Sequence, residues 1–326
     1  MPAPDLMDSL VPLAEGSAVH AVRHQRAKVV AATQGSHDAL FDPTLPGLGL
    51  AERLLVALRI AELSGCPALV AHYRGQLQGL PVLTADEQAA LAGRAAGGRL
   101  QAVLAFASTL TTRPVDGDQA ALRTLPAAGL HTANVVALAQ LIAYVAYQVR
   151  VLVGLQALQA MGPVETAPAP AADGAVAPFV HPAHLPKPGE PVRIKGYTSE
   201  TLGWKAWLPV LDLAQATAAQ LAILESSHPQ AKTSHYYLLL AYQPRILEER
   251  STVFNAIMYA PGGLSRAERE LATAAVSRIN GCVYCASVHA QRFEQLTKRN
   301  DVICQLFEEP RTAGTNARER AIVQAS

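Results

Sequence analysis

Alanine and leucine recur at spacings of three and four residues along most of this 326-residue chain, which is the periodicity of one face of an α-helix. Alternating runs of β-branched residues bounded by turn residues, the pattern of strands, are nearly absent. With 50% hydrophobic and only 16% charged residues, the helices carry enough apolar surface to bury packed cores. The sequence therefore predicts an all-α protein.

A change of composition divides the chain. Residues 161–190 (MGPVETAPAPAADGAVAPFVHPAHLPKPGE) are rich in Pro, Ala and Gly, a composition that does not continue a helix and is typical of a connector. The length also exceeds that of a usual single domain. We predict an amino-terminal domain over 1–160, a linker over 161–190 and a carboxy-terminal domain over 191–326.

The two predicted domains share short sequence matches at a constant offset. Ala51-Glu52-Arg53 recurs as Ala267-Glu268-Arg269, and Gly65-Cys66 recurs as Gly281-Cys282, so both pairs lie 216 residues apart (267 − 51 and 282 − 66). Self-similarity at a fixed offset indicates a duplicated unit. We expect two tandem copies of one helical fold, packed as a pseudo-dimer. The apolar helix that closes the first copy has no counterpart before Ser326, so the second copy is expected to lack its last helix.

A helix is expected directly before the second copy's cysteines. Ser265 followed three residues later by Glu268 is a capping box. Leu271, Ala275 and Ile279 then fall at four-residue spacing on one face. The Asn-Gly pair that follows ends this helix and allows a sharp turn into the next.

The most informative segment is the Cys-x-x-Cys-x-x-x-His run after that turn. Cys282 and Cys285 are three residues apart and Cys285 and His289 four apart, so all three side chains share one face of a helix. Both cysteines fall in the first turn, where the helix dipole and unpaired N–H groups favour a thiolate. Glu270 lies at the edge of the preceding helix's apolar face, within reach of the turn. This arrangement predicts a disulfide-forming redox pair.

Three other interpretations of the cysteines stay open on this evidence. A structural zinc site needs four ligands, whereas Cys-x-x-Cys plus one His supplies three. A thioredoxin-like motif needs βαβ surroundings, which are missing here. Two cysteines that merely pack are common in helical cores, although His289 argues against this. Cys304 has no His or Cys neighbour at helical spacing, and we expect a free structural thiol.

The segment ERELATAAVSRINGCVYCASVH (268–289) resembles the signature of the alkylhydroperoxidase D and carboxymuconolactone decarboxylase family, in its peroxidase-related branch. The family pattern has a Glu twelve residues before the first Cys and a His four after the second, where this chain has Glu270 and His289. In the first copy, ALRTLPAAGL and AQLIAYVAYQVR also resemble later helices of the family. One departure is Tyr284 between the cysteines, where some members carry a second His.

The resemblance implies an all-helical fold and reduction of organic hydroperoxides by a dithiol, without haem, flavin or metal. His289 and Glu270 would form a relay that draws the proton from Cys285. Cys285 would attack the peroxide and become a sulfenic acid, and Cys282 would condense with it to a disulfide. An external dithiol, such as a lipoyl-protein or thioredoxin-like donor, would reduce that disulfide. The alternatives are a non-catalytic redox sensor or scaffold, and a lactone decarboxylase or hydrolase of the same fold.

The first copy keeps only one of these groups. At the common offset, the carboxylate, the second thiol and the imidazole are replaced by Leu54, Leu69 and Tyr73, and only the first thiol has a counterpart, Cys66. We therefore expect the amino-terminal domain to be a degenerate copy that packs beside the active one. A separate ligand role that uses His72 and Tyr73 is the alternative.

Charge and cysteine content narrow the partners and the compartment. Lys+Arg 27 against Asp+Glu 26 gives a formal charge of +1, and no long run of either sign is present, which argues against a nucleic-acid surface or a polybasic membrane patch. Four cysteines are too few for a disulfide scaffold, and Asp5 and Asp8 lie where a signal peptide would carry basic residues. We expect a cytoplasmic protein that forms homo-oligomers through exposed apolar helices.

One stretch has the apolar character of a membrane span. Residues 124–149 contain no charged side chain, but Pro126, His131 and Asn134 interrupt them. The remaining apolar run, 135–147, is shorter than the ~20 residues that a bilayer requires. We therefore expect a buried or subunit-facing helix and no membrane partner.

Overall fold

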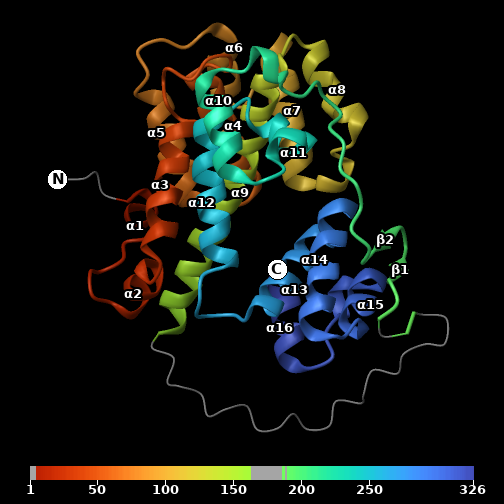
Figure 1. Cartoon of the computed structure of the whole chain (residues 1–326). Coiled ribbons are helices and arrows are strands. Elements are labelled where there is room, and N and C mark those ends of the chain that lie inside the picture. The colour runs from red at the N-terminus through yellow and green to blue at the C-terminus, as the bar shows by residue number, and fades with distance from the viewer. Residues whose placement is uncertain (1–4, 163–185, 188) are drawn as a thin grey trace. The chain divides into compact units, whose positions relative to one another are not determined.

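The structure is a computed structural model that describes residues 5–162, 186–187 and 189–326 (Figure 1). Within these ranges the chain forms sixteen α-helices and one pair of two-residue strands, which confirms the all-α prediction. Most of the predicted linker, residues 163–185 and 188, lies outside the described residues.

The chain separates into two compact units. Unit 1 comprises Met1–Pro163 and Lys205–Ile257, and unit 2 comprises Val164–Trp204 and Met258–Ser326.

The boundary between the units differs from the predicted one, because residues 205–257 group with unit 1. Their apolar side chains are the reason. Leu211 and Leu224 share a buried cluster with Val136, and Ile246 joins the main core of unit 1. Local sequence composition carries no information about this long-range packing.

Unit 1 is built almost entirely of helices. Its α-helices are α1 (Leu6–Leu10), α2 (Ala18–His24), α3 (Ala27–Leu40), α4 (Leu50–Leu63), α5 (Pro67–Gln78), α6 (Ala85–Leu91), α7 (Gly98–Thr112), α8 (Gln119–Ala127), α9 (Thr132–Met161), α10 (Ala218–Ser227), α11 (His235–Leu240) and α12 (Pro244–Met258), the last residue of which belongs to unit 2. Three short 3₁₀ turns lie at Pro114–Asp116, Leu213–Gln215 and Ala231–Thr233.

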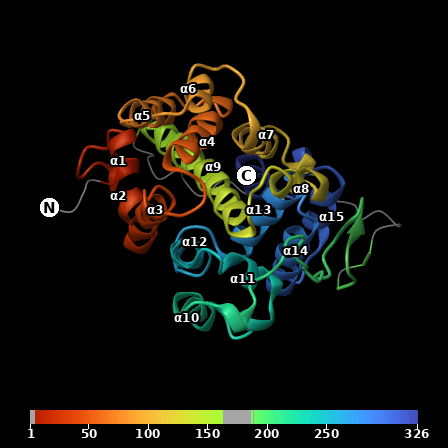
Figure 2. The same cartoon turned by 90° about the horizontal axis from the view of Figure 1, so that it is seen from above.

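The long helix α9 runs through the core of unit 1. It contacts α1, α2 and α3 on one side and α7 and α8 on the other (Figure 2). By length and composition α9 is apolar enough to cross a membrane, and 56% of its most apolar 18-residue window is buried within the structure. Leu138, Leu141 and Val145 have no exposed surface. The charge-free stretch of the sequence thus contains a buried helix, separated from α8 by a turn at Gly129, where φ is +89°.

Unit 2 is smaller and holds the cysteine motif. Its elements are β1 (Arg193–Ile194), β2 (Tyr197–Thr198), α13 (Arg266–Ile279), α14 (Val283–Thr297), α15 (Asp301–Glu308), a 3₁₀ turn at Pro310–Thr312 and α16 (Ala317–Ala325). The two strands pair antiparallel, Arg193 opposite Thr198. Figure 1 shows α13 and α14 as neighbouring blue helices, with β2 against α14.

Small side chains allow α13 and α14 to pack closely. Leu271, Ala274 and Ala275 on α13 lie in one buried cluster with Ala286 and Ala290 on α14. The predicted apolar face of α13 is therefore correct for its first two positions. The prediction was wrong for the third position, Ile279, because this residue is the last of the helix and is 48% exposed.

The helix pairs α4–α5 and α13–α14 agree in several details at the offset of 216. α4 and α13 begin and end at equivalent residues, and in both the third helical residue, Glu52 or Glu268, accepts a hydrogen bond from the N–H of the N-cap residue. The two capping glutamates each pair with an arginine of a later helix, Arg99 and Arg318.

A second shared detail is an arginine that holds the preceding loop. Arg53 donates to the backbone carbonyls of Leu40, Asp42 and Leu48. Arg269 donates in the same way to the carbonyls of Met258, Ala260 and Gly262.

Candidate functional site

The bend between α13 and α14 fixes the position of the first cysteine. Gly281 adopts φ +78°, a left-handed conformation that glycine reaches without a Cβ penalty. The N–H of Cys282 donates to the carbonyl of Ser277 at 2.9 Å, and that of Gly281 to Arg278 at 3.4 Å, which is the Schellman pattern of a helix end. Cys282 thereby becomes the N-cap residue of α14. The predicted Asn-Gly turn thus has its physical basis in this motif.

The two thiols are reduced and in contact. Cys282 and Cys285 are free and half-buried, and the Sγ of Cys282 accepts a hydrogen bond from the backbone N–H of Cys285 at 3.4 Å. The pKa of Cys282 is lowered to about 6, chiefly by a hydrogen bond from the Cys285 thiol. Burial opposes this shift, while the N–H groups of Cys285 and Tyr284 add to it, as does His289 when its imidazole is protonated. These contacts favour the thiolate form of Cys282 at neutral pH.

An acid–histidine pair lies beside the thiols. Glu270 on α13 accepts a hydrogen bond at 2.6 Å from Nδ1 of His289 on α14. Because a carboxylate only accepts, Nδ1 is the protonated nitrogen and Nε2 of a neutral imidazole is left as a proton acceptor. Glu270 is 1% exposed and His289 14% by side chain. The family resemblance implied a relay of Glu270 and His289, and the structure places these two side chains in contact.

The carboxylate of Glu270 stays ionised although it is buried. Burial alone would raise its pKa, but the hydrogen bonds from His289 and Arg266 outweigh burial and lower the pKa. Arg266 donates from Nε to the other carboxylate oxygen, Oε1, at 2.6 Å. The guanidinium of Arg266 also lies 4.2 Å from the ring centroid of Tyr259. Both oxygens of Glu270 are thus held by cations or N–H donors.

Arg266 is a site residue that the sequence pattern did not single out. The spacing could have indicated it, because an Arg and a Glu four residues apart on a helix, such as Arg266 and Glu270, lie side by side. The residue types alone did not show that Glu270 is buried and that Arg266 holds its carboxylate, since i,i+4 ion pairs are most often surface features.

The four predicted site residues form one cluster with two direct contacts. Glu270 binds His289, Cys282 binds Cys285, and the charge of His289 acts on Cys282. One feature adds to the expected relay: the pKa of Cys282, the N-cap residue of α14, is lowered. The fourth cysteine, Cys304, is fully buried, and burial raises its pKa to about 12, as befits an unreactive thiol.

The equivalent positions of unit 1 contain no such set of groups. Cys66 is the buried N-cap residue of α5, and Leu69 and Tyr73 lie buried on that helix. The hydroxyl of Tyr73 donates to the side chain of Gln148. His72 is adjacent, and burial lowers its pKa to about 4, so its imidazole is neutral at pH 7.

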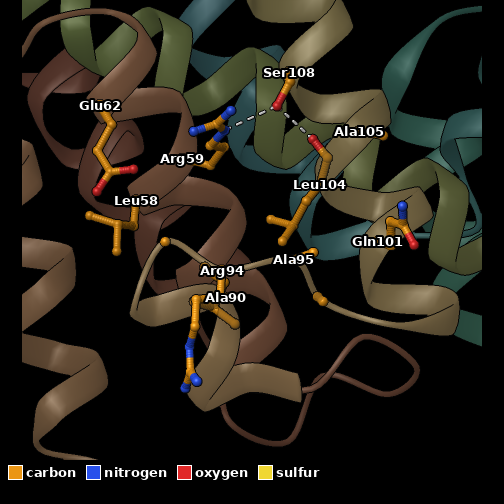
Figure 3. Close-up of a pocket in the computed structure, with 13 residues that line it drawn as sticks. Leu58, Arg59, Glu62, Ala90, Arg94, Ala95, Gln101, Leu104, Ala105 and Ser108 are labelled. Atoms are coloured by element: carbon orange, nitrogen blue, oxygen red, sulfur yellow. Dashed lines mark hydrogen bonds between the residues drawn. The ribbon is translucent and has the colours of Figure 1, made fainter. Parts of the chain in front are cut away.

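The cavities of the described residues include two that no cysteine lines. One of about 320 Å³ is lined by α4, α6, α7 and the loop before α7, with Arg59, Glu62 and Arg94 among the residues drawn in Figure 3. Arg59 is held there by Ser108 at 3.2 Å. The other, of about 290 Å³, is lined by the loop 258–265 together with Arg266 and Arg269. It therefore adjoins the arginine that holds Glu270.

The geometry defines a helical dithiol site with a buried acid–histidine pair. Residues 244–326 match the sequence model of the carboxymuconolactone decarboxylase family. This match, which covers roughly a quarter of the chain, includes α12 and all four site residues and confirms the family resemblance drawn from them. Residues 244–326 are therefore similar to this family. No curated protein and no solved structure matches the chain significantly.

Proposed function

We propose that the carboxy-terminal region is a thiol-dependent peroxidase that reduces organic hydroperoxides through Cys282 and Cys285. The observation that carries the proposal is the lowered pKa of Cys282 next to the Glu270–His289 hydrogen bond. A thiolate is the reactive form of cysteine, and an oriented imidazole beside a second thiol is the arrangement of an activated nucleophile.

In the proposed first step, Nε2 of His289 takes the proton of the Cys285 thiol. The Cys285 sulfur then attacks the terminal oxygen of the hydroperoxide, so that an S–O bond forms and the O–O bond breaks. The leaving alkoxide takes the proton from His289 and departs as an alcohol. Cys285 is oxidised to a sulfenic acid and the peroxide is reduced. Glu270 stabilises the imidazolium between these two transfers.

In the second step, the Cys282 thiolate attacks the sulfenic sulfur of Cys285. A disulfide forms, and hydroxide leaves and is protonated to water. The low pKa of Cys282 fits this role for two reasons. The attacking thiolate is already present at neutral pH, and a low-pKa thiol is also the better leaving group when an external dithiol later attacks Cys285.

Turnover requires two electrons from outside the chain. We propose an external dithiol of the lipoyl or thioredoxin-like kind, which opens the disulfide by thiol exchange and is itself oxidised. Both cysteines are half-buried rather than enclosed, which leaves the sulfurs accessible to such a donor.

We also propose that unit 1 contains a degenerate copy of the same helical element, acting as a structural partner. The proposal is supported by the equal bounds of α4 and α13 and by the matching roles of Arg53 and Arg269. Leu69 and Tyr73 supply neither thiol nor free imidazole, so this copy has no means to run the dithiol reaction.

The proposal is tested by the rate of hydroperoxide consumption in the presence of excess dihydrolipoamide. The wild-type chain and Cys304→Ser, a change at a buried thiol outside the site, are expected to consume peroxide continuously. Cys285→Ser is expected to reduce the rate to that of the dithiol alone. An undiminished rate in Cys285→Ser overturns the proposal.

The same assay separates the proposed peroxidase from the two alternative functions. A non-catalytic redox sensor would be oxidised once per chain and would not turn over. A lactone decarboxylase or hydrolase would act on its substrate regardless of the cysteines, and its chemistry has no evident use for the dithiol.

A further inference from the structure

We propose that Asp8, His20 and His24 form a binding site for a divalent transition-metal ion in unit 1. Asp8 comes from α1, and the two histidines come from α2. One ligand atom from each of the three residues lies within 4.8 Å of the others. This cluster has no part in the proposed peroxidase chemistry, so the result of testing one proposal does not affect the other.

The histidines are placed for a shared ligand. His20 and His24 are four residues apart on α2, and their rings are stacked with centroids 4.2 Å apart. Residues at this spacing lie on one helix face, which is the arrangement of two imidazole ligands from a single helix. The ring of His20 makes no hydrogen bond within the part of the chain that the structure describes, so both of its nitrogens are available.

The carboxylate completes the set. Oδ2 of Asp8 lies 2.6 Å from Nε2 of His24, and Oδ1 of Asp8 is buried without a hydrogen-bond partner. An ion between these groups would replace the proton that Asp8 and His24 share and would lie near the Asp8 oxygen that has no hydrogen-bond partner.

The local charge also suits a cation. Arg23 lies beside the cluster, but its guanidinium is occupied by both carboxylate oxygens of Asp5, at 3.2 and 3.3 Å. Its Nε is 3.8 Å from Oδ1 of Asp8, beyond hydrogen-bond distance. Two carboxylates thus face one arginine, and with neutral imidazoles the group carries one negative charge.

The donor set indicates which ions fit. Two imidazole nitrogens and one carboxylate oxygen suit Zn²⁺, Co²⁺ or Ni²⁺, whereas Mg²⁺ and Ca²⁺ prefer oxygen ligands alone. Bonds of roughly 2.0–2.2 Å to each ligand require the three atoms to draw together by rotation of side chains, which half-exposed histidines permit. The bound ion would tie α1 to α2.

The test uses the full chain without an affinity tag, in a Cys282→Ser/Cys285→Ser background that removes the competing thiols. Co²⁺ is titrated and followed by its visible absorption, and the thermal midpoint of unfolding is measured with ZnCl₂ and with MgCl₂. We expect one Co²⁺ per chain and an upward shift of the midpoint with Zn²⁺ only, since a ligand that binds the folded state stabilises it.

Two variants assign the site. His20→Ala removes a ligand without breaking a hydrogen bond of its ring within the described residues. Asp8→Asn removes the charge and keeps the shape of the side chain. Both variants are expected to abolish the Co²⁺ absorption. His131→Ala, at an exposed histidine, is the matched control and is expected to keep it. No Co²⁺ absorption in the background chain, or absorption that survives both variants, overturns the proposal. Circular dichroism of each variant verifies that loss of binding is not loss of fold.

Discussion

Arg266 and Glu270 lie four residues apart on α13, and the Nε of the arginine donates a 2.6 Å hydrogen bond to Oε1 of the carboxylate. The other oxygen of Glu270 accepts from His289. The arginine therefore orients the acid that orients the imidazole, without reaching the sulfur atoms itself. We regard Arg266 as a positioning residue of the proposed relay.

The first prediction concerns this arginine. Arg266→Gln should lower kcat for hydroperoxide reduction by about tenfold, because a general base contributes ~10²–10⁴ in rate and a freely rotating Glu270 would hold His289 less well. Arg266→Lys keeps a cation and should recover part of the loss. KM is expected to change little. Equal activity of the Gln and Lys variants would show that the charge at this position does not matter to the reaction.

The second prediction is the acidity of Cys282. The thiolate absorbance of the reduced chain should rise with a midpoint near pH 6 and should be lost in Cys282→Ser. Cys285→Ala should move this midpoint upward most, because it removes the largest stabilising hydrogen bond. His289→Ala should move it upward less. A midpoint unchanged in Cys285→Ala would contradict the assignment of the hydrogen bond between the thiols.

The third prediction separates the four cysteines by reactivity. Iodoacetamide at pH 7 should label Cys282 and Cys285 in the folded chain and leave Cys66 and Cys304 unmodified, because both are buried and the pKa of Cys304 is raised to about 12. Mass spectrometry of tryptic peptides measures the labelling. After denaturation all four should react, which serves as the control. Rapid labelling of Cys304 in the native chain would count against its buried position.

The fourth prediction concerns Glu294, a residue of α14 outside the relay. Burial raises its pKa to about 7, although a hydrogen bond with Ser199 opposes the shift, and its Oε1 is buried without a hydrogen-bond partner. A carboxyl whose pKa is raised on folding prefers to be protonated in the folded state. Ionisation therefore costs stability as the pH rises from its ordinary value of 4.5 towards 7.

Glu294→Gln should accordingly stabilise the chain at pH 8 and leave it nearly unchanged at pH 4.5. We expect a gain of about 1–2 kcal/mol, since one pKa unit corresponds to ~1.4 kcal/mol and the partial exposure of the group reduces the effect. Urea denaturation at the two pH values measures it. A variant less stable than wild type at pH 8 would refute a Glu294 pKa that burial raises.

Much of unit 2 follows from local sequence. The capping box at Ser265, the Asn-Gly turn and the spacing of Cys282, Cys285 and His289 each have a short-range physical cause, and the structure contains all of them. The Glu270–His289 pairing was implied by the family resemblance, and the tight turn between the two helices brings the two side chains together.

Other features depend on contacts between distant segments. The packing of residues 205–257 with unit 1 follows from the apolar cluster around Val136, which no local pattern encodes. The lowered pKa of Cys282 depends on which sulfur accepts the N–H groups of the first turn, and helical spacing places both cysteines alike. The helix α13 ends with Ile279 facing outward, although its spacing matched the buried face.

The central claim is that one peroxide molecule oxidises one Cys282–Cys285 pair. The most direct measurement is peptide mass spectrometry of the reduced chain after addition of one equivalent of an organic hydroperoxide, without reductant. We predict that the tryptic peptide that contains both cysteines loses the mass of two hydrogen atoms, and that Cys282→Ser instead accumulates a sulfenic acid on Cys285 that dimedone traps. A peptide that keeps both thiols while the peroxide persists would contradict the account.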